Sequence, residues 1–256
     1  GNSGISIGES NQANGYWTHT DGIIDDIGIW DRALTEQEIT NLYEDSTTCL
    51  PNYIPSNGLV GFWPFCGNAN DSSSNNLDAN VIGSTDLTND RFGQANSAYD
   101  FDYANASFGR QNDEIYIPYD DILNVNNITV SVWLYPRQYF WNGDSNNPKS
   151  TIINRFQYGY SNPNGETWGI DFSNSNLRAY IIEASTDNNN PAEVVSYDNQ
   201  IPLDTWHHIV FSYDGTNLKL YLNGVLVSSV STNINLNTAG NSGISIGESN
   251  QANGYW

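Results

Sequence analysis

The stretch "WHHIVFSYDGTNLKLYLNGVLVSSV", residues 206–230, decides the fold class. Its apolar side chains recur at every second position, which is the period of a β-strand with one buried face. The pair Asn223-Gly224 readily takes the positive φ angles of a tight turn between two strands. The stretch therefore predicts a β-hairpin, with the leucines from Leu218 to Leu222 on one face.

The same alternation appears elsewhere in the chain, for example in "ITVSVWLYP", residues 128–136. Tracts rich in turn-forming residues separate such segments, including "DSSSNN" at 71–76 and "TDNNNP" at 186–191. Short strands punctuated in this way are typical of an antiparallel sandwich, whereas βαβ units would need a helix after each strand.

One segment has a helical pattern instead. In "LTEQEITNLYED", residues 34–45, Thr35 is followed three residues later by Glu38, which is the arrangement of a capping box. Ile39 and Leu42 follow at a spacing that an amphipathic helix can use. We expect one short helix here.

The composition is strongly acidic. Eight Lys and Arg stand against 29 Asp and Glu, so the formal net charge is -21. Such a chain repels nucleic acid and anionic lipid surfaces, which proteins bind through clustered Lys and Arg, and it favours cations as partners. The alternative is that the charge only keeps an extracellular protein soluble. No run of about eighteen apolar residues is present, so we expect no membrane insertion.

The two cysteines, Cys49 and Cys66, bracket a stretch that contains Pro51, Pro55 and Gly58. A disulfide between them would tie a linker to the first strand of a domain and would require an oxidising compartment. Two unrelated buried thiols are the alternative.

Five blocks of sequence carry a family resemblance: "GIIDDIGIWDRALTEQEITNLY" (22–43), "NGLVGFWPFCGNANDSSSNN" (57–76), "RFGQANSAYDFD" (91–102), "ITVSVWLYP" (128–136) and "TWHHIVFSYDGTNLKLYLNGVLV" (205–227). Block after block, they resemble the LamG-like modules of the concanavalin A-like lectin/glucanase superfamily. The resemblance implies an all-β fold, a two-sheet antiparallel jelly-roll sandwich with one short helix. It also implies a secreted or cell-surface protein, since such modules occur in bacterial surface proteins and adhesins.

The order of the blocks differs from the family's order, in which the block at 22–43 comes last. Moreover, "GNSGISIGESNQANGYW" occurs twice, as residues 1–17 and 240–256, which gives a repeat period of 240 − 1 = 239 residues. Residues 1–48 then correspond to the C-terminal strands and short helix of a preceding or swapped module. Residues 49–57 are the linker, and residues 56–256 are a module that lacks its own final strand and helix.

Three arrangements explain this order of the blocks and the repeat. The chain can be a window of a tandem array of identical modules, its first segment can complete another subunit by strand exchange, or it can be a circular permutant that completes itself. In each, an equivalent of residues 18–48 must cover strands that would otherwise have unpaired edges.

Catalytic residues are not apparent. Glycosidases of this superfamily need two carboxylates at a fixed separation, whereas Glu166, Glu183 and Glu193 stand apart from one another. His207 and His208 lie in a strand whose role in the family is structural. We therefore predict that the protein is not an enzyme.

Oxygen-rich side chains suggest a site for Ca²⁺, which takes carboxylate and amide oxygens as ligands. Asn68, Asn70 and Asp71 share one loop, and Asp25 and Asp26 are neighbours in a strand, where they should point to opposite faces. The resemblance implies that Asp71 and one of the two strand aspartates hold a calcium ion between them. The alternatives are that Asp71 is a turn residue and that the strand pair is a solvated edge.

The segment "RQYFWNGD", residues 137–144, combines aromatic rings with polar side chains, as sugar-binding sites do. The resemblance adds residues of strands that could face the concave sheet, where ligands of the superfamily bind; the alternative is that the alternating aromatic side chains of these strands fill the core and that Arg178 is a lone surface cation. The predicted carbohydrate-binding residues are Tyr139, Trp141, Asn142, Asp144, Arg155, Trp168 and Arg178.

Together these features predict a non-catalytic repeating module of an extracellular adhesin or surface filament. Near-identical units of 239 residues would assemble it, with calcium as a stabilising ion and identical neighbouring modules or subunits as partners. The alternative function is calcium-dependent binding of carbohydrate by a lectin-like module, with glycans as partners.

Overall fold

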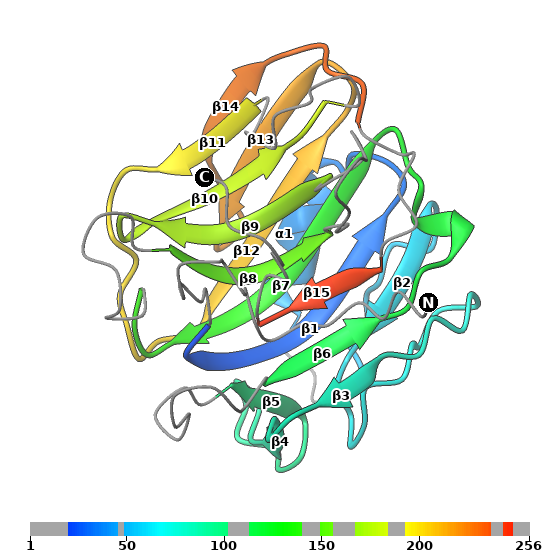
Figure 1. Ribbon diagram of the computed structural model, residues 1–256, viewed down its shortest axis with the longest axis vertical. Coiled ribbons are helices and arrows are strands. Elements are labelled where there is room, and N and C mark those ends of the chain that lie inside the picture. The colour runs from blue at the N-terminus through cyan, green and yellow to red at the C-terminus, as the bar shows by residue number, and fades with distance from the viewer. Residues whose placement is uncertain are drawn as a thin grey trace, which may run out of the picture.

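The computed structural model describes residues 20–45, 49–101, 113–139, 149–155, 167–183, 193–236 and 243–247. They form two antiparallel sheets packed face to face, with one helix outside the first sheet (Figure 1). This confirms the predicted two-sheet antiparallel sandwich with one short helix. The described residues add one turn of 3-10 helix, η2 (Asp121–Leu123).

The first sheet has eight strands. Its order is β14 (Val225–Ser231), β13 (Asn217–Leu222), β12 (His207–Tyr213), β7 (Ile128–Pro136), β1 (Gly22–Trp30), β5 (Ala98–Phe101) and β4 (Asp86–Thr88), with β2 (Leu59–Trp63) also paired to β1.

The second sheet has seven strands. Its order is β11 (Glu193–Tyr197), β10 (Asn176–Ile181), β9 (Trp168–Ser173), β8 (Lys149–Arg155), β15 (Ile244–Ile246), β6 (Glu114–Ile117) and β3 (Asn80–Ile82).

The predicted hairpin is present as β13 and β14. Asn223 and Gly224 form its turn with φ angles of 53° and 76°, as their sequence predicts. Leu218 and Leu220 are fully buried in the core between the sheets, where apolar burial supplies most of the driving force for folding.

Strand β1 lies inside the first sheet and not at its edge. One side of β1 pairs with β7, and the other side pairs with β5 near Gly22 and with β2 near Trp30 (Figure 1). The segment that precedes the linker therefore completes the sheet of the same chain, as in the third of the three arrangements. Its assignment to a preceding module stays a prediction.

Helix α1 (Glu36–Glu44) follows β1 and covers part of the outer face of the first sheet. Ile39 and Leu42 are buried against Trp30, Val210 and Tyr221 in a second, smaller apolar cluster. No helix among the described residues is long and apolar enough to cross a membrane.

Candidate functional site

Three charged side chains are buried together where β1 meets the loop between β4 and β5: Asp25, Asp26 and Arg91, which we call the Arg91 junction. Asp25 pairs with Trp133 of β7 and Gly28 pairs with Ser131, so β1 carries one extra residue there. Asp26 in this β-bulge has a φ angle of 44°. The bulge turns Asp26 toward the same side as Asp25, so the expectation that the two carboxylates face opposite ways is wrong.

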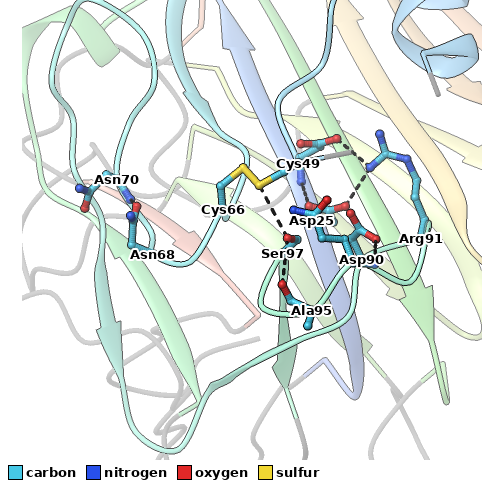
Figure 2. Close-up of a disulfide and its surroundings, with 11 residues drawn as sticks. Asp25, Cys49, Cys66, Asn68, Asn70, Asp90, Arg91, Ala95 and Ser97 are labelled. Atoms are coloured by element: carbon cyan, nitrogen blue, oxygen red, sulfur yellow. Dashed lines mark hydrogen bonds and ion pairs between the residues drawn. A yellow bond between two sulfur atoms is a disulfide. The ribbon is translucent and has the colours of Figure 1, made fainter. Parts of the chain in front are cut away.

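Both carboxylates bind one guanidinium group. Arg91, from the loop between β4 and β5, lies 2.8 Å from Asp25 Oδ2 and 2.7 Å from Asp26 Oδ2 (Figure 2). The side chains of Asp25, Asp26 and Arg91 are only 3%, 8% and 6% exposed. Hydrogen bonds between charged groups are short and geometrically specific, so this contact fixes the position of β1 against the loop.

An aromatic stack holds Arg91 from the side. Its guanidinium carbon lies 4.4 Å from the ring centre of Trp133, and that ring in turn stacks on His208 at 5.0 Å. Tyr43, near the end of α1, stacks on the same indole at 5.8 Å. The guanidinium carbon also lies 4.5 Å from the ring centre of Phe92, so the planar cation contacts two π faces, which are favourable surfaces for arginine.

Burial sets the protonation states at this junction. Desolvation raises the pKa of Asp25 well above its ordinary value, and the neighbouring Asp26 raises it further. Desolvation also raises the pKa of Asp26 to about 6, although Arg91 opposes the shift. Asp90 raises both values. The pKa of His208 falls to about 3, because burial disfavours its cation and Arg91 repels it.

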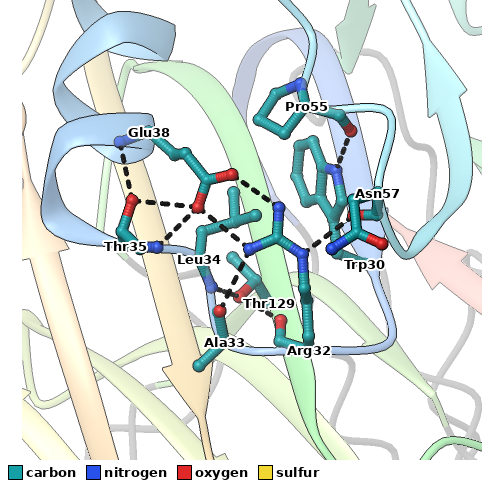
Figure 3. Close-up of polar contacts among 9 residues, drawn as sticks. All are labelled: Trp30, Arg32, Ala33, Leu34, Thr35, Glu38, Pro55, Asn57 and Thr129. Atoms are coloured by element: carbon teal, nitrogen blue, oxygen red, sulfur yellow. Dashed lines mark hydrogen bonds and ion pairs between the residues drawn. The ribbon is translucent and has the colours of Figure 1, made fainter.

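A second set of contacts fixes α1 beside the junction (Figure 3). Thr35 Oγ1 accepts a hydrogen bond from Glu38 N at 3.2 Å, and Glu38 Oε2 accepts one from Thr35 N at 2.8 Å, which is the predicted capping box. Arg32 donates to both carboxylate oxygens of Glu38, at 2.9 and 2.6 Å. Thr129 Oγ1 of β7 donates to Arg32 O and accepts from Leu34 N, which ties the turn before α1 to the sheet.

The linker is fastened at both ends. Trp30 Nε1 donates to Pro55 O at 2.7 Å (Figure 3), and Cys49 and Cys66 form the predicted disulfide (Figure 2). The disulfide joins the linker to the residues that directly follow β2. Residues 20–45 are therefore attached to the remainder of the chain by ion pairs and by apolar packing, and the disulfide holds the linker that follows them.

The loop predicted to bind calcium is internally satisfied. Asp71 Oδ1 accepts hydrogen bonds from the backbone of Phe62 and Ser73, and Oδ2 accepts from Ser73 Oγ and Leu77 N, all between 2.7 and 2.9 Å. Asp71 thus organises a turn, which was the alternative interpretation.

The two asparagines proposed as calcium ligands lie apart from the strand aspartates. Asn68 Oδ1 accepts from Asn70 N at 2.9 Å, and Figure 2 shows both residues across the disulfide from Asp25. Within the described ranges, no three His, Cys, Asp or Glu side chains gather as metal ligands would. Arg91 already supplies the positive charge at the two strand aspartates. The residues present therefore do not fit a calcium ion in this arrangement, and calcium binding stays a prediction.

The outer face of the second sheet is polar. One row of paired residues crosses all seven strands. Within it, the side chain of Tyr180 covers Gly169, since a Cβ atom on Gly169 would come within 2.3 Å of the Tyr180 hydroxyl oxygen. The row consists of Asn80, Tyr116, Ser245, Asn154, Gly169, Tyr180 and Val194. Beside it, Arg178 binds Asp171 through two hydrogen bonds and lies 5.3 Å from the ring of Tyr180.

Two predicted sugar-binding residues face the other way. Trp168 lies between the sheets, with its ring centre 5.8 Å from that of Phe211. Arg155, which pairs with Trp168 on the neighbouring strand β8, donates to Leu123 O and Asn124 Oδ1. Their placement on the concave face is a wrong prediction, because Trp168 shares the inward face of β9 with Ile170 and Phe172.

The remaining predicted sugar-binding residues are dispersed. Tyr139 donates its hydroxyl hydrogen to Ile201 O and packs edge-on against Phe172. Trp141, Asn142 and Asp144 lie outside the described residues. Arg178 is on the outer face, as expected.

Arg91, which is the centre of the junction, was not predicted from the sequence. A signal was available, since the chain has only eight Lys and Arg against 29 acidic residues. A cation in such a chain has many possible partners, and the pairing of Arg91 with one of them could not be read from spacing alone.

We expect Asp26→Asn to change how stability depends on pH. The folded pKa of Asp26, about 6, lies above its ordinary value of 3.8, so this group gains stability as the pH falls. His208, with its lowered pKa, acts in the opposite direction. On acidification from about pH 7.5 to about pH 5, the variant should therefore lose more free energy of unfolding than the parent, by on the order of 1 kcal/mol.

Urea unfolding at both pH values would measure this difference. Asp198→Asn, at an exposed carboxyl, is the control and should leave the pH dependence as it is in the parent. Equal pH dependence in Asp26→Asn and the parent would contradict the expectation.

Removal of divalent cations provides a separate test. Because Arg91 neutralises Asp25 and Asp26, and backbone donors occupy Asp71, we expect EDTA to leave the melting temperature unchanged. A melting temperature that rises with calcium and returns with EDTA would instead show a stabilising calcium site. Asp71→Asn would then show whether Asp71 belongs to that site.

Several solved structures are similar to this one. The botulinum neurotoxin serotype C1 binding domain matches with 16% identity, 71% of this chain, 40% of that chain and a TM-score of 0.47. The binding domain of botulinum neurotoxin DC in complex with SialylT is 16% identical, and the match covers 71% of this chain and 41% of that chain with a TM-score of 0.48. A third match is domain 4 of AbnA, a GH43 extracellular arabinanase from Geobacillus stearothermophilus, in complex with arabinotriose. It is 17% identical, and the match covers 73% of this chain and 82% of that chain with a TM-score of 0.44.

At these scores the likeness carries no argument about function. This chain also spans less than half the length of the two neurotoxin chains. No sequence among the curated proteins matches it.

A family model matches the sequence itself over residues 108–256, which is more than half of the chain. The matched part contains β7, the hairpin of β13 and β14, and the whole of β15. The chain therefore belongs to the concanavalin A-like lectin/glucanases superfamily.

Proposed function

We propose that this protein is a non-catalytic repeating module of an extracellular adhesin or surface filament. The observation that supports the proposal is the position of β1. This strand precedes the linker in the chain, yet it pairs with three strands of the sheet that follows the linker.

A repeat with this phase joins neighbouring modules mechanically. In an array of 239-residue units, a segment equivalent to residues 18–48 stands between every two bodies. The Arg91 ion pairs connect that segment to the body on its C-terminal side, and the bond from Trp30 to Pro55 and the disulfide fasten the linker between them. Each segment would then be held on the body that follows it, and the function of the array would be to extend over a distance.

The disulfide also supports the extracellular part of the proposal. Such bonds persist in oxidising compartments and are rare in the reducing cytosol. The high negative charge suits a protein that must stay soluble outside the cell.

The test is to express residues 56–256 alone. Loss of β1 would expose the edges of β7, β5 and β2, so the fragment should aggregate or polymerise. A separately made segment of residues 18–48 should restore a soluble species. Light scattering and circular dichroism would follow both.

Residues 18–256 with Cys49→Ser and Cys66→Ser serve as the matched control, and the fragment of residues 56–256 carries Cys66→Ser, so that neither protein has an unpaired thiol. A soluble monomer of residues 56–256 that unfolds cooperatively would contradict the proposal.

A second candidate function, glycan binding, is favoured by the outer face of the second sheet. Tyr116 and Arg178 are partly exposed there beside buried polar side chains, and aromatic rings with charged groups are what sugar-binding surfaces combine. We infer that a ligand would lie across the row that contains Tyr116 and Tyr180.

A glycan array, with and without calcium, tests this second function. Tyr116→Ala should reduce any binding by up to about tenfold, which corresponds to losing one stacking contact. Lys219→Ala, in β13 of the other sheet, should not affect binding. An array without any bound glycan would dismiss this candidate.

A further inference from the structure

Two Asn-Gly pairs lie in the described part of the chain, Asn57-Gly58 and Asn223-Gly224, and both occupy turns. We propose that Asn57 is a site of spontaneous deamidation in the folded protein, and that the fold protects Asn223 from the same reaction. This is a covalent modification with water as its one co-reactant. It goes beyond the proposed function and does not depend on it.

Asn-Gly pairs can react without an enzyme. The main-chain nitrogen of the glycine attacks the side-chain carbonyl carbon of the asparagine, and a new C–N bond closes a succinimide ring. The side-chain nitrogen leaves as ammonia and takes with it the proton of the glycine amide. Water then opens the ring at either of its two carbonyl groups, which gives aspartate or isoaspartate. Glycine favours the attack because it has no Cβ atom to hinder the approach.

The turn at Asn57 leaves the reacting groups accessible. Leu59 N donates to Ser56 O at 3.4 Å, which closes a β-turn, and Gly58 takes a φ angle of 74° at the third position of that turn. Asn57 is exposed, and no hydrogen bond to another described residue holds its side-chain amide or the N–H of Gly58. The side chain can therefore rotate towards the glycine nitrogen without breaking a contact.

The hairpin turn holds Asn223 in place. Asn223 Oδ1 accepts a hydrogen bond from His208 N at 2.9 Å, and Asn223 N donates to His208 O at 2.8 Å. Gly224 lies against Tyr43, since a Cβ atom on Gly224 would come within 3.1 Å of that ring. Asn223 must leave these partners before its side chain can react. Its deamidation therefore waits for a local opening of the hairpin.

Modification at Asn57 alters a contact of β1. Asp31, directly after β1, donates its N–H to Gly58 O at 2.8 Å, and Arg32 Nε donates to Asn57 O at 2.9 Å (Figure 3). In isoaspartate the main chain runs through the former side chain and is longer by one carbon atom. The hydrogen bond between Asp31 and Gly58 cannot keep its geometry after this change. Deamidation therefore loosens the end of β1, which pairs there with β2.

Peptide mapping of the folded chain, residues 1–256, tests the proposal. After incubation in a mildly alkaline buffer, mass spectrometry measures aspartate plus isoaspartate in the peptides that contain the two pairs. We expect deamidation at Asn57 to be at least about tenfold faster than at Asn223, because only the latter requires the hairpin to open. The same chain, reduced and held in urea, is the control, and there the two rates should become similar.

Two results would overturn the proposal. One is that Asn223 reacts in the folded chain as fast as Asn57. The other is that Asn57 reacts in urea but not in the folded chain. Neither result bears on the repeating-module proposal, which is tested by the fragment of residues 56–256.

The effect on β1 is tested with Asn57→Gln, because glutamine keeps the amide group but cyclises far more slowly. Parent and variant are aged in the same way, so changes at other asparagines affect them alike. The aged parent should melt about 2 to 4 °C below the aged variant, the shift expected from the loss of one hydrogen bond. Equal melting temperatures, with Asn57 converted in the parent, would show that the modification does not loosen β1.

Discussion

Strand β1 is the element on which the other parts of this structure depend. It is the only described strand that pairs with three others, and its isoleucines at positions 24, 27 and 29 enter the main core. Because β1 comes before the linker and its partners come after it, the chain must cross back over the sheet. Helix α1 and the linker occupy the outer face for this reason, and their contacts with Trp30 and Thr129 follow from it.

The Arg91 junction shows how a polar cluster can be specific without adding much stability. Two aspartates that lose their water and share one guanidinium are expensive to bury, which the raised pKa values express. Such a cluster nevertheless forbids most wrong pairings, because a β1 shifted by one residue would leave Arg91 buried without its partners. Bulge, loop and aromatic stack together define one register for β1.

Local signals in the sequence predicted much of this fold. Asn223-Gly224 specifies its turn through its own backbone preferences, and Thr35 with Glu38 specifies the start of α1 through side chains three residues apart. The bulge at Asp26 could not be predicted in this way, because it depends on the register of β1 against β7, a strand about a hundred residues away. Arg91 meets its partners only through that register.

The error over Trp168 is of another kind. Alternation in "WGIDFS" already places Trp168 with Ile170 and Phe172 on one face and Gly169 with Asp171 on the other, so the apolar face could have been assigned to the core. A resemblance to lectins directed attention to aromatic side chains. The periodicity of the strand was the better guide.

The disulfide between Cys49 and Cys66 has a consequence for a chain under tension. A covalent bridge across a sequence separation of 17 takes the residues between its ends out of the load path, so a pulling force passes directly from the end of α1 to the end of β2. The loop that contains Leu50 to Phe65 cannot lengthen. Strand β2 lies inside this loop, so the pull bypasses β2 while its backbone hydrogen bonds hold it against β1.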